Sequence, residues 1–393
     1  MTTSEKPRFA LAQETIDRED IAELIAWLET NPWLTQGPLT RKFESTWARW
    51  LGTEHAVYVN SGSSANLLMY YALALSGRLK NRKVIVPAIS WATTVAPAIQ
   101  LGFEPIMCDG DEETFGLDLA QLDALCREHD PGAVILVHVL GVPHKMEQMQ
   151  ELKHRHGFVL MEDACAATGS RYDGRLVGTF GELSSFSFYF GHHLSTIEGG
   201  MVCTNDEQLQ DIMLQIRSHG WAKDLAPEKE HALVEEFGVL DFNRCFAFYH
   251  PGFNLRPTDL GAKLGLGQLT KIDRVLARRI ENHQIYQKNF LASDSFHCQR
   301  NERAEICSIS FAALAQSEEH RARVARALEA YGVETRPLGG GNMSRQPFWT
   351  KRYDAVAMPL ADRIHTTSFH LPNNPQISPQ QVQQICDVVL AVS

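Results

Sequence analysis

Short runs of apolar residues alternate with longer stretches of helical spacing through most of the chain. The apolar runs have the length of β-strands and are almost continuously hydrophobic, which is typical of strands buried on both faces. They cover residues 55–60, 83–86, 133–139, 158–161, 184–189 and 200–204. We therefore expect an α/β fold with a mainly parallel sheet between two layers of helices. Ligands of such sheets bind at the carboxyl ends of the strands.

The last third of the chain is dominated by helical spacing. We expect there a helix over 264–291, a strand over 307–311 and helices over 318–331 and 380–392. This combination is typical of a smaller α+β domain. The sequence therefore predicts a large domain over 1–275 and a small C-terminal domain over 276–393.

Composition and charge describe an ordinary globular protein and narrow its possible functions. The chain has 393 residues, is 44% hydrophobic and carries a formal net charge of -10. The acidic balance and the lack of a basic block argue against nucleic-acid binding. Without a signal-peptide pattern or an apolar run of about 18 residues, we expect no membrane contact and a cytoplasmic protein. Eight scattered cysteines without a CxxC pair predict reduced thiols.

Acidic and aromatic residues after two of these strands suit the ring of pyridoxal phosphate (PLP). Asp163 ends a buried strand, where its carboxylate could pair with the pyridine nitrogen. The alternative for Asp163 is a helix N-cap. Trp91 follows Pro87 and could stack on the flat ring, although a lone tryptophan is more often a core residue.

Small hydroxylated residues could hold the phosphate. Gly62 and Ser63 lie in the SGSS turn between a strand and a helix, where backbone N–H groups and the helix dipole attract an anion. Ser187, in a later strand, could add a hydroxyl group. By itself the SGSS turn is weak evidence, because many strand–helix turns have this composition.

The order of these segments is more specific than any one of them. SGSS, PAISW, ED and SFSFYFGHHLSTIEGG together resemble the DegT/StrS family of nucleotide-sugar aminotransferases. The resemblance extends to residues 252–256, 334–337 and 345–347, and so to most of the chain. It implies the fold of aspartate aminotransferase (fold type I), with a mainly parallel seven-stranded sheet. It also implies a homodimer with active sites at the subunit interface.

The resemblance also assigns roles to individual residues. Asp163 would pair with the pyridine nitrogen. Gly62, Ser63 and Ser187, with Asn254 of the partner subunit, would hold the phosphate. His219, Arg336 and Arg345 are candidates for contacts with the substrate or with the carboxylates of glutamate.

One position departs from the family pattern. The family has a lysine six residues before the glutamate of its EGG or DGG turn, and here that position is His192. No lysine occurs between Asp163 and Lys223, so this stretch cannot hold PLP through an imine. The departure resembles a subgroup of pyridoxamine-phosphate (PMP)-dependent sugar 3-dehydratases.

This subgroup implies a non-covalent cofactor, which L-glutamate converts to PMP with release of 2-oxoglutarate. The amine would react with the C4 ketone of GDP-4-keto-6-deoxy-D-mannose, and His192 would act as the acid and base that expels the C3 hydroxyl. Ammonia and a 3-deoxysugar would result, on a route to colitose in the lipopolysaccharide O-antigen. An imidazole titrates near neutral pH and cannot compete for the cofactor aldehyde.

Several alternatives remain open from the sequence. His193 could be the base instead of His192, or the histidine pair could be core residues. No cysteine or acid lies at ligand spacing from the pair, so we expect no metal site. A related CDP-sugar 3-dehydrase needs a [2Fe–2S] cluster and a reductase, but only Cys245 lies between Lys223 and Arg256, so we expect no cluster. A true aminotransferase and a catalytically silent PLP-binding regulator are the other possibilities.

Overall fold

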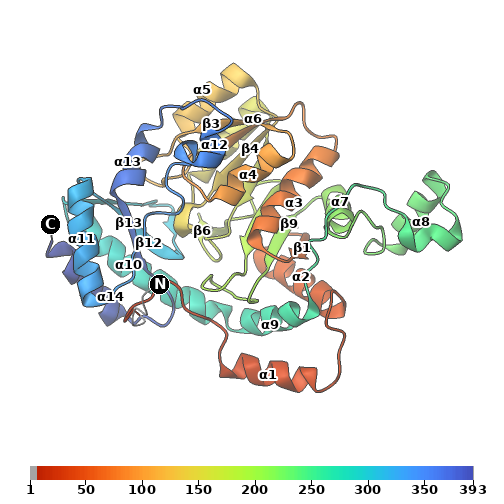
Figure 1. Cartoon of the computed structure of the whole chain (residues 1–393), viewed down its shortest axis with the longest axis horizontal. Coiled ribbons are helices and arrows are strands. Elements are labelled where there is room, and N and C mark those ends of the chain that lie inside the picture. Colours follow the sequence, from red (N-terminus) through yellow and green to blue (C-terminus); the bar gives the residue numbers. More distant parts are fainter. Residues whose placement is uncertain (1–6, 393) are drawn as a thin grey trace.

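A seven-stranded sheet forms the centre of the large domain in the computed structural model, which describes residues 7–392 (Figure 1). The strand order is β1-β9-β8-β5-β4-β2-β3, and β9 alone runs in the direction opposite to the other strands. The strands are β1 (His55–Val59), β2 (Lys83–Pro87), β3 (Glu104–Cys108), β4 (Ala133–Val137), β5 (Val159–Asp163), β8 (Leu183–Ser187) and β9 (Gly200–Thr204). The expected α/β, fold-type-I class with a mainly parallel seven-stranded sheet is confirmed.

Alternate residues of each strand face different helical layers, as a period of two requires. In β4, Ala133 and Ile135 pack in the core shared with α3 (Gly62–Leu75), whereas Val134 and Leu136 pack on the side of α6 (Met146–His156). The first side also has α4 (Ala92–Gln100) and α7 (Glu207–Arg217), and the second has α5 (Leu119–His129). A separate core joins α2 (Pro38–Leu51) and α9 (Asp259–Thr270) to the β1 end of the sheet.

Strand β3 was not expected from the sequence. Its residues, EPIMC, contain Pro105, which interrupts the apolar run. Because β3 is an edge strand, a proline costs it no ladder bond on the open side. Its position at the edge thus explains why a weak pattern still forms a strand.

The single helix expected over 264–291 is wrong. The chain forms two helices, α9 and α10 (Ile272–Leu291), that meet at Lys271. Helix α9 packs against α2 of the large domain, whereas α10 packs Tyr286 and Phe290 into the small-domain core. The two helices bury their apolar faces in different cores, so the chain changes direction between them.

The small domain has its own three-stranded antiparallel sheet, in the order β10 (Phe296–Cys298), β12 (Ser310–Ala315) and β13 (Ser368–Pro372). Helices α10, α11 (Glu318–Tyr331) and α14 (Pro379–Leu390) cover it on one side (Figure 1). Helix α11 has the expected limits, whereas the strand expected over 307–311 begins at Ser310. The proposed division at residue 275 falls within α10 and stays a prediction.

The remaining elements lie outside these two sheets. They are α1 (Arg18–Leu28), α8 (Pro227–Glu236), α12 (Pro347–Thr350), α13 (Pro359–Thr367), the short strands β6 (Arg171–Tyr172), β7 (Arg175–Leu176) and β11 (Ala304–Glu305), and the 3-10 helices η1 (Val139–Gly141), η2 (Asp241–Phe246) and η3 (Met343–Arg345). Helix α8 stands away from the body of the molecule (Figure 1). Between residues 7 and 392, no helix combines the length and apolar character needed to cross a membrane.

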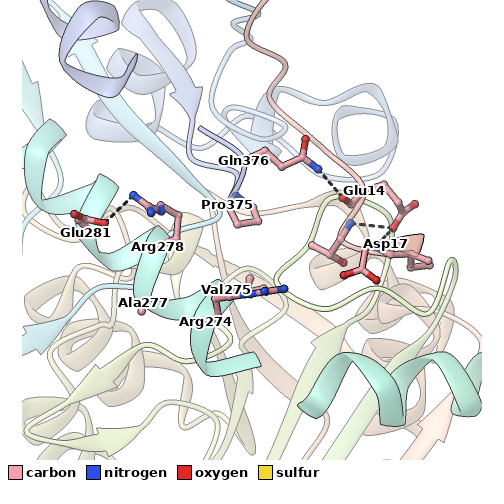
Figure 2. A pocket seen from close by; sticks show the side chains of 11 residues that line it. Glu14, Asp17, Arg274, Val275, Ala277, Arg278, Glu281, Pro375 and Gln376 are labelled. Carbon is pink, nitrogen blue, oxygen red and sulfur yellow. Dashed lines mark hydrogen bonds and ion pairs between the residues drawn. The ribbon is translucent and has the colours of Figure 1, made fainter. Parts of the chain in front are cut away.

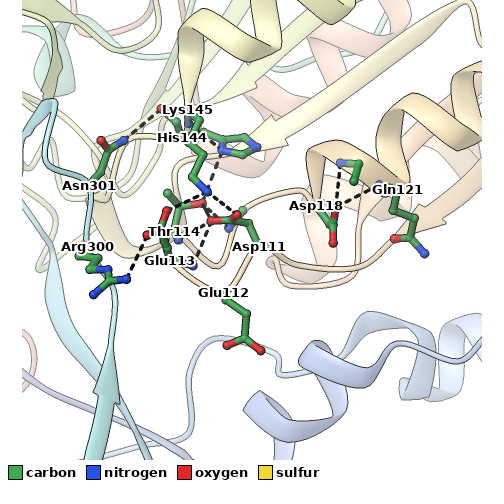
Figure 3. A network of polar contacts seen from close by, with 12 residues as sticks. Asp111, Glu112, Glu113, Thr114, Asp118, Gln121, His144, Lys145, Arg300 and Asn301 are labelled. Atoms are coloured by element: carbon green, nitrogen blue, oxygen red, sulfur yellow. Dashed lines mark hydrogen bonds and ion pairs between the residues drawn. The ribbon is translucent and has the colours of Figure 1, made fainter.

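A network of charged groups joins the loop after β3 to the small domain (Figure 3). Lys145 Nζ lies 2.7 Å from Asp111 Oδ2 and 2.9 Å from Glu113 Oε2. On the small-domain side, Arg300 contacts Glu113 through both its guanidinium group and its backbone N–H. The network fixes the small domain against the edge of the large sheet.

Candidate functional site

Asp163 is the buried centre of the site. It ends β5, and its Oδ2 accepts hydrogen bonds from Asn66 Nδ2 at 2.9 Å and Thr94 Oγ1 at 2.7 Å. Its Oδ1 accepts one from the backbone N–H of Cys165 at 3.1 Å. No helix begins at Asp163, so the N-cap alternative is wrong. A carboxylate accepts about four hydrogen bonds, which leaves room for a protonated ring nitrogen.

The turn before α3 meets the end of β8. Ser61 caps α3, because its Oγ accepts from the N–H of Ser64 at 3.0 Å. A Cβ atom added at Gly62 would lie 2.6 Å from the Cβ of Ser187, so only glycine permits this approach. The hydroxyl groups of Ser63 and Thr93 lie 2.9 Å apart nearby. Free N–H groups and hydroxyls at a helix N-terminus are the usual ligands of a phosphate.

Trp91 is available to cover a flat ligand. It is 61% exposed and precedes α4, the helix that carries Thr94 to Asp163. The interpretation of Trp91 as a core residue is therefore wrong. Its indole lies at the same edge of the sheet as the buried carboxylate.

His192 joins this group through a single hydrogen bond. Its Nδ1 lies 2.8 Å from the carbonyl oxygen of Cys165, two residues after Asp163. A carbonyl only accepts, so Nδ1 carries the hydrogen and Nε2 keeps a lone pair. Burial lowers the pKa of the half-buried imidazole to about 4, with a further decrease from the Arg279 guanidinium and opposition from the Cys165 carbonyl. His192 is therefore neutral at pH 7.

His193 points away from the other site residues. Its side chain is 1% exposed, and its Nε2 donates to the carbonyl oxygen of Cys307 at 2.9 Å. Burial lowers the pKa of His193 well below its usual value. The structure thus makes His193 a core residue and leaves His192 as the histidine at the site.

The other predicted residues lie elsewhere. Asn254 is exposed and its Oδ1 accepts from Arg256 Nε at 3.1 Å. It pairs with Ser218 beside His219, whose backbone is in the left-handed region at φ 63°. No hydrogen bond or ring contact connects Asn254 or His219 to His192 in the described part of the chain.

Arg336 and Arg345 belong to the small domain, and each already has an acidic partner. Arg336 pairs with Glu334, and Arg345 Nε lies 2.6 Å from Asp362 Oδ1. Their side chains are 68% and 50% exposed, respectively. The structure brings neither arginine into contact with the residues around Asp163.

A separate pocket of about 530 Å³ lies between the N-terminal segment, α10 and the loop after β13 (Figure 2). It is lined by Glu14, Thr15, Ile16, Asp17, Arg274, Val275, Ala277, Arg278, Glu281, Pro375 and Gln376. None of the predicted site residues lines it. Positive and negative side chains both contribute, so the pocket has no clear preference for an anion.

Sequence reasoning missed Asn66, Thr93, Thr94 and Arg279. The first three had a signal, since Asn66 interrupts an apolar helix and the threonines begin α4 directly after Trp91. Arg279 had none, because it follows another arginine in a helix with many charges.

The assembled residues fit PLP. They offer a buried carboxylate for the ring nitrogen, hydroxyls and a helix N-terminus for the phosphate, and an exposed indole for the ring. Residues 7–392 contain no group of three His, Cys, Asp or Glu side chains that could hold a metal ion.

Comparisons with known proteins agree with this geometry. Residues 14–390 match the DegT/DnrJ/EryC1/StrS aminotransferase family. The chain is 32% identical over 351 residues to GDP-4-keto-6-deoxy-D-mannose 3-dehydratase of Yersinia pseudotuberculosis, with 88% of each chain covered. It is 30% identical over 361 residues to GDP-perosamine synthase of Escherichia coli O157:H7, with 91% of each covered.

A solved structure of GDP-4-keto-6-deoxy-D-mannose-3-dehydratase from E. coli, with bound hydrated PLP, superposes with a TM-score of 0.88 at 27% identity. The superposition covers 98% of this chain and 100% of the other. The chain therefore belongs to the DegT/DnrJ/EryC1/StrS aminotransferase family and is a PLP-dependent enzyme of sugar modification.

Proposed function

We propose that the chain is a nucleotide-sugar 3-dehydratase that removes the C3 hydroxyl of GDP-4-keto-6-deoxy-D-mannose. PLP and PMP would be held without a covalent bond, and L-glutamate would supply the amino group, with release of 2-oxoglutarate and ammonia. The product would serve colitose formation for a lipopolysaccharide O-antigen. The observation that carries the proposal is His192, an imidazole with a free Nε2, at the position where the family has its lysine.

Bound PMP supplies an amine that reacts with the sugar ketone and a ring that withdraws electrons. The chain would do the rest. Asp163 would keep the ring nitrogen protonated, and Gly62, Ser63 and Ser187 would fix the phosphate. Trp91 would cover the ring and exclude water from one face.

His192 Nε2 would accept a proton from the carbon beside the amine and return it to the departing C3 oxygen. Because its pKa is about 4, the ring is neutral before the step and strongly acidic after it. The same atom can therefore act as base and then as acid. A lysine in its place would compete for the cofactor carbon.

The second subunit enters this proposal through Asn254 and the projecting segment around α8. Asn254 is exposed, and among the described residues no hydrogen bond joins its side chain to the phosphate candidates of its own chain. The α8 segment exposes several aromatic side chains, namely Phe237, Phe242, Phe246 and Phe248. Exposed aromatic clusters mark association surfaces, so we propose a homodimer in which Asn254 of the partner subunit completes the phosphate site.

The experiment is to incubate the protein with PLP, L-glutamate and GDP-4-keto-6-deoxy-D-mannose and to weigh the sugar product. We expect the loss of one oxygen atom, together with release of 2-oxoglutarate. Parallel reactions with CDP- and dTDP-linked ketosugars test the choice of nucleotide. No 2-oxoglutarate and no change in the PLP absorbance would refute the enzyme and favour a silent PLP-binding protein.

An aminotransferase that leaves the amine on the sugar is the second candidate. The similarity to GDP-perosamine synthase favours it. A product that gains an amino group while keeping its C3 oxygen would establish it. Borohydride reduction gives a second distinction, because PLP that becomes fixed to the polypeptide would contradict a non-covalent cofactor.

A further inference from the structure

Arg279 contacts the backbone of the turn that carries His192. The residue lies on α10 and its side chain is fully buried. Its Nη2 donates to the carbonyl oxygens of Gly191 at 3.2 Å and His192 at 3.3 Å. Its Nη1 donates to the carbonyl oxygens of Ile309 at 3.0 Å and Asn373 at 2.7 Å. One guanidinium thus joins three segments that are distant in the sequence.

This guanidinium has no acidic partner among the described residues. Burial lowers the pKa of Arg279 to about 10, so the group still carries its charge at neutral pH. A buried charge without a counter-ion is a cost to folding, even when carbonyl dipoles surround it. The four carbonyl acceptors offset this cost only in part, because Nε of Arg279 is buried without a hydrogen-bond partner among the described residues.

The segment that holds the Arg279 guanidinium is itself bound back to α10, and the turn has a further close neighbour at Gly191. Asn373 Nδ2 donates back to the carbonyl oxygen of Arg279 at 3.0 Å and to Ser308 Oγ at 2.8 Å. A Cβ atom at Gly191, where φ is 82°, would lie 2.6 Å from the Cβ of Ala12. The turn is therefore held between the N-terminal segment, α10 and the strand region of the small domain.

We propose that Arg279 is the positioning residue for His192: its guanidinium fixes the Gly191–His192 backbone, so that the imidazole is aimed at the cofactor. This role rests on the proposed function, in which His192 is the base. The guanidinium is planar, its Nη1 is bound to Ile309 and Asn373, and its Nη2 donates to two consecutive carbonyls, so it constrains the direction of the peptide plane between them.

The charge acts in the same direction as burial. A cation close to an imidazole disfavours its protonated form, and the Arg279 guanidinium lowers the pKa of both His192 and His193. Arg279 therefore has two effects on His192, one on the position of the ring and one on its pKa. Different substitutions of Arg279 can remove them separately.

The test uses Arg279→Lys, which keeps the charge, and Arg279→Met, which removes it, in the PLP-loaded full chain. The matched controls are Arg278→Lys and Arg278→Met, because Arg278 is the preceding residue of α10 and forms an exposed pair with Glu281. We would measure kcat and KM with the ketosugar, and titrate the His192 ring by NMR with labelled histidine.

For Arg279→Lys we expect kcat to fall about 10²-fold with KM changed less than about twofold, because a misplaced base slows the proton step while binding is intact. For Arg279→Met we expect a similar fall in kcat, and in addition an upward shift of the His192 titration. The Arg278 variants should match the unmodified protein in both readouts.

Unchanged kcat and an unchanged His192 titration in both Arg279 variants would overturn the proposal. So would equal losses in the Arg278 and Arg279 variants. If neither Arg279 variant folds, the contacts can be tested in the unmodified protein by proton exchange. A buried, hydrogen-bonded Arg279 guanidinium must exchange its protons with water more slowly than that of Arg278 does. Equal exchange rates would refute the contacts on which the role depends.

The NMR readouts need no substrate, so the two proposals can fail separately. A protein without 3-dehydratase activity, in which Arg279→Met still shifts the His192 titration, would refute the proposed function and uphold the positioning contact. An active 3-dehydratase in which neither Arg279 variant changes kcat or the His192 titration would uphold the proposed function and refute the positioning role.

Discussion

Two adjacent histidines have different surroundings, and this difference determines their chemistry. The Nδ1 of His192 is bound to the Cys165 carbonyl, and its Nε2 is left with a lone pair. His193 donates its Nε2 hydrogen into the core, and its Nδ1 is buried without a partner. A ring in the first environment can exchange protons with a ligand, whereas a ring in the second is closed to one.

Replacing His192 with asparagine should abolish useful turnover without unfolding the protein. Asparagine can retain a bond to the Cys165 carbonyl but cannot accept a proton, so we expect kcat to fall by about 10² to 10⁴. Thermal unfolding should change little. The control is His154→Asn, an exposed histidine of α6. Near-normal turnover by the His192 variant would contradict its role as the base.

The dependence of kcat on pH should differ from that of an ordinary histidine base. A free imidazole has a pKa of about 6.5, whereas burial lowers the pKa of His192 to about 4. Because the neutral ring is the active form, we expect kcat at pH 5.5 to stay close to its value at pH 7. The measurement is kcat at saturating substrate across this range. A half-loss centred near pH 6.5 would show that His192 is exposed to water during the reaction.

At the scale of elements, helix α3 connects fold stability to cofactor binding. Ser61 caps the helix, Gly62 lets it approach Ser187, and Asn66 reaches Asp163 from the second turn. The first turn thus presents its N–H groups and dipole to one place. A change in the cap should affect both the helix and its ligand.

Ser61→Ala should lower the free energy of unfolding by about 1 kcal/mol and also weaken PLP binding. The expected reason is the loss of the hydrogen bond from the Ser64 N–H, which lets the first turn fray. Ser317→Ala is the matched control, since Ser317 caps α11 in the same way but lies in the small domain. Urea denaturation should show similar losses in the free energy of unfolding for both variants. PLP titration should show a loss of affinity for Ser61→Ala alone. Equal PLP affinities of the two variants would show that the turn before α3 does not bind the phosphate.

At the scale of the whole molecule, buried histidines link stability to acidity. Burial lowers the pKa of several of them, namely His144, His193 and His283. The unfolded chain, with pKa values of about 6.5, therefore binds more protons than the folded one below that pH. Stability is fully present above about pH 6.5 and is lost as the pH falls towards the folded-state values.

We therefore expect the melting temperature to fall steadily between pH 7 and pH 4.5. The slope should be smaller in a His283→Gln variant, because one of the contributing groups is removed. Melting curves at constant ionic strength provide the measurement. A constant melting temperature over this range would mean that these rings are not buried in the folded protein.

A mixed dimer can show whether Asn254 serves the neighbouring subunit. Pairing an Asn254→Ala chain with a His192→Asn chain leaves one intact site if Asn254 acts across the interface, and none if it acts within its own chain. We expect roughly half of the normal activity per dimer. Each parental homodimer should be far less active. Native mass spectrometry first has to establish the dimer. An inactive mixed dimer would show that Asn254 acts on the site of its own subunit.

Local patterns of the sequence determined much of the fold and the type of site. The alternation of apolar runs and helical stretches predicts the mainly parallel sheet, because burial on both faces requires continuous apolar strands. The absence of a lysine at position 192 and the serines of the SGSS turn also follow from the chain alone. Each of these features depends on neighbouring residues, so a linear reading can find it.

Only the tertiary structure decided which histidine faces the site and what holds it. The partner of His192, the Cys165 carbonyl, lies 27 residues away, and Arg279 lies 87 residues from the carbonyl that it contacts. The break between α9 and α10 likewise results from two separate cores. Contacts between distant segments form only when the sheet and both domains are assembled, and spacing along the chain does not encode them.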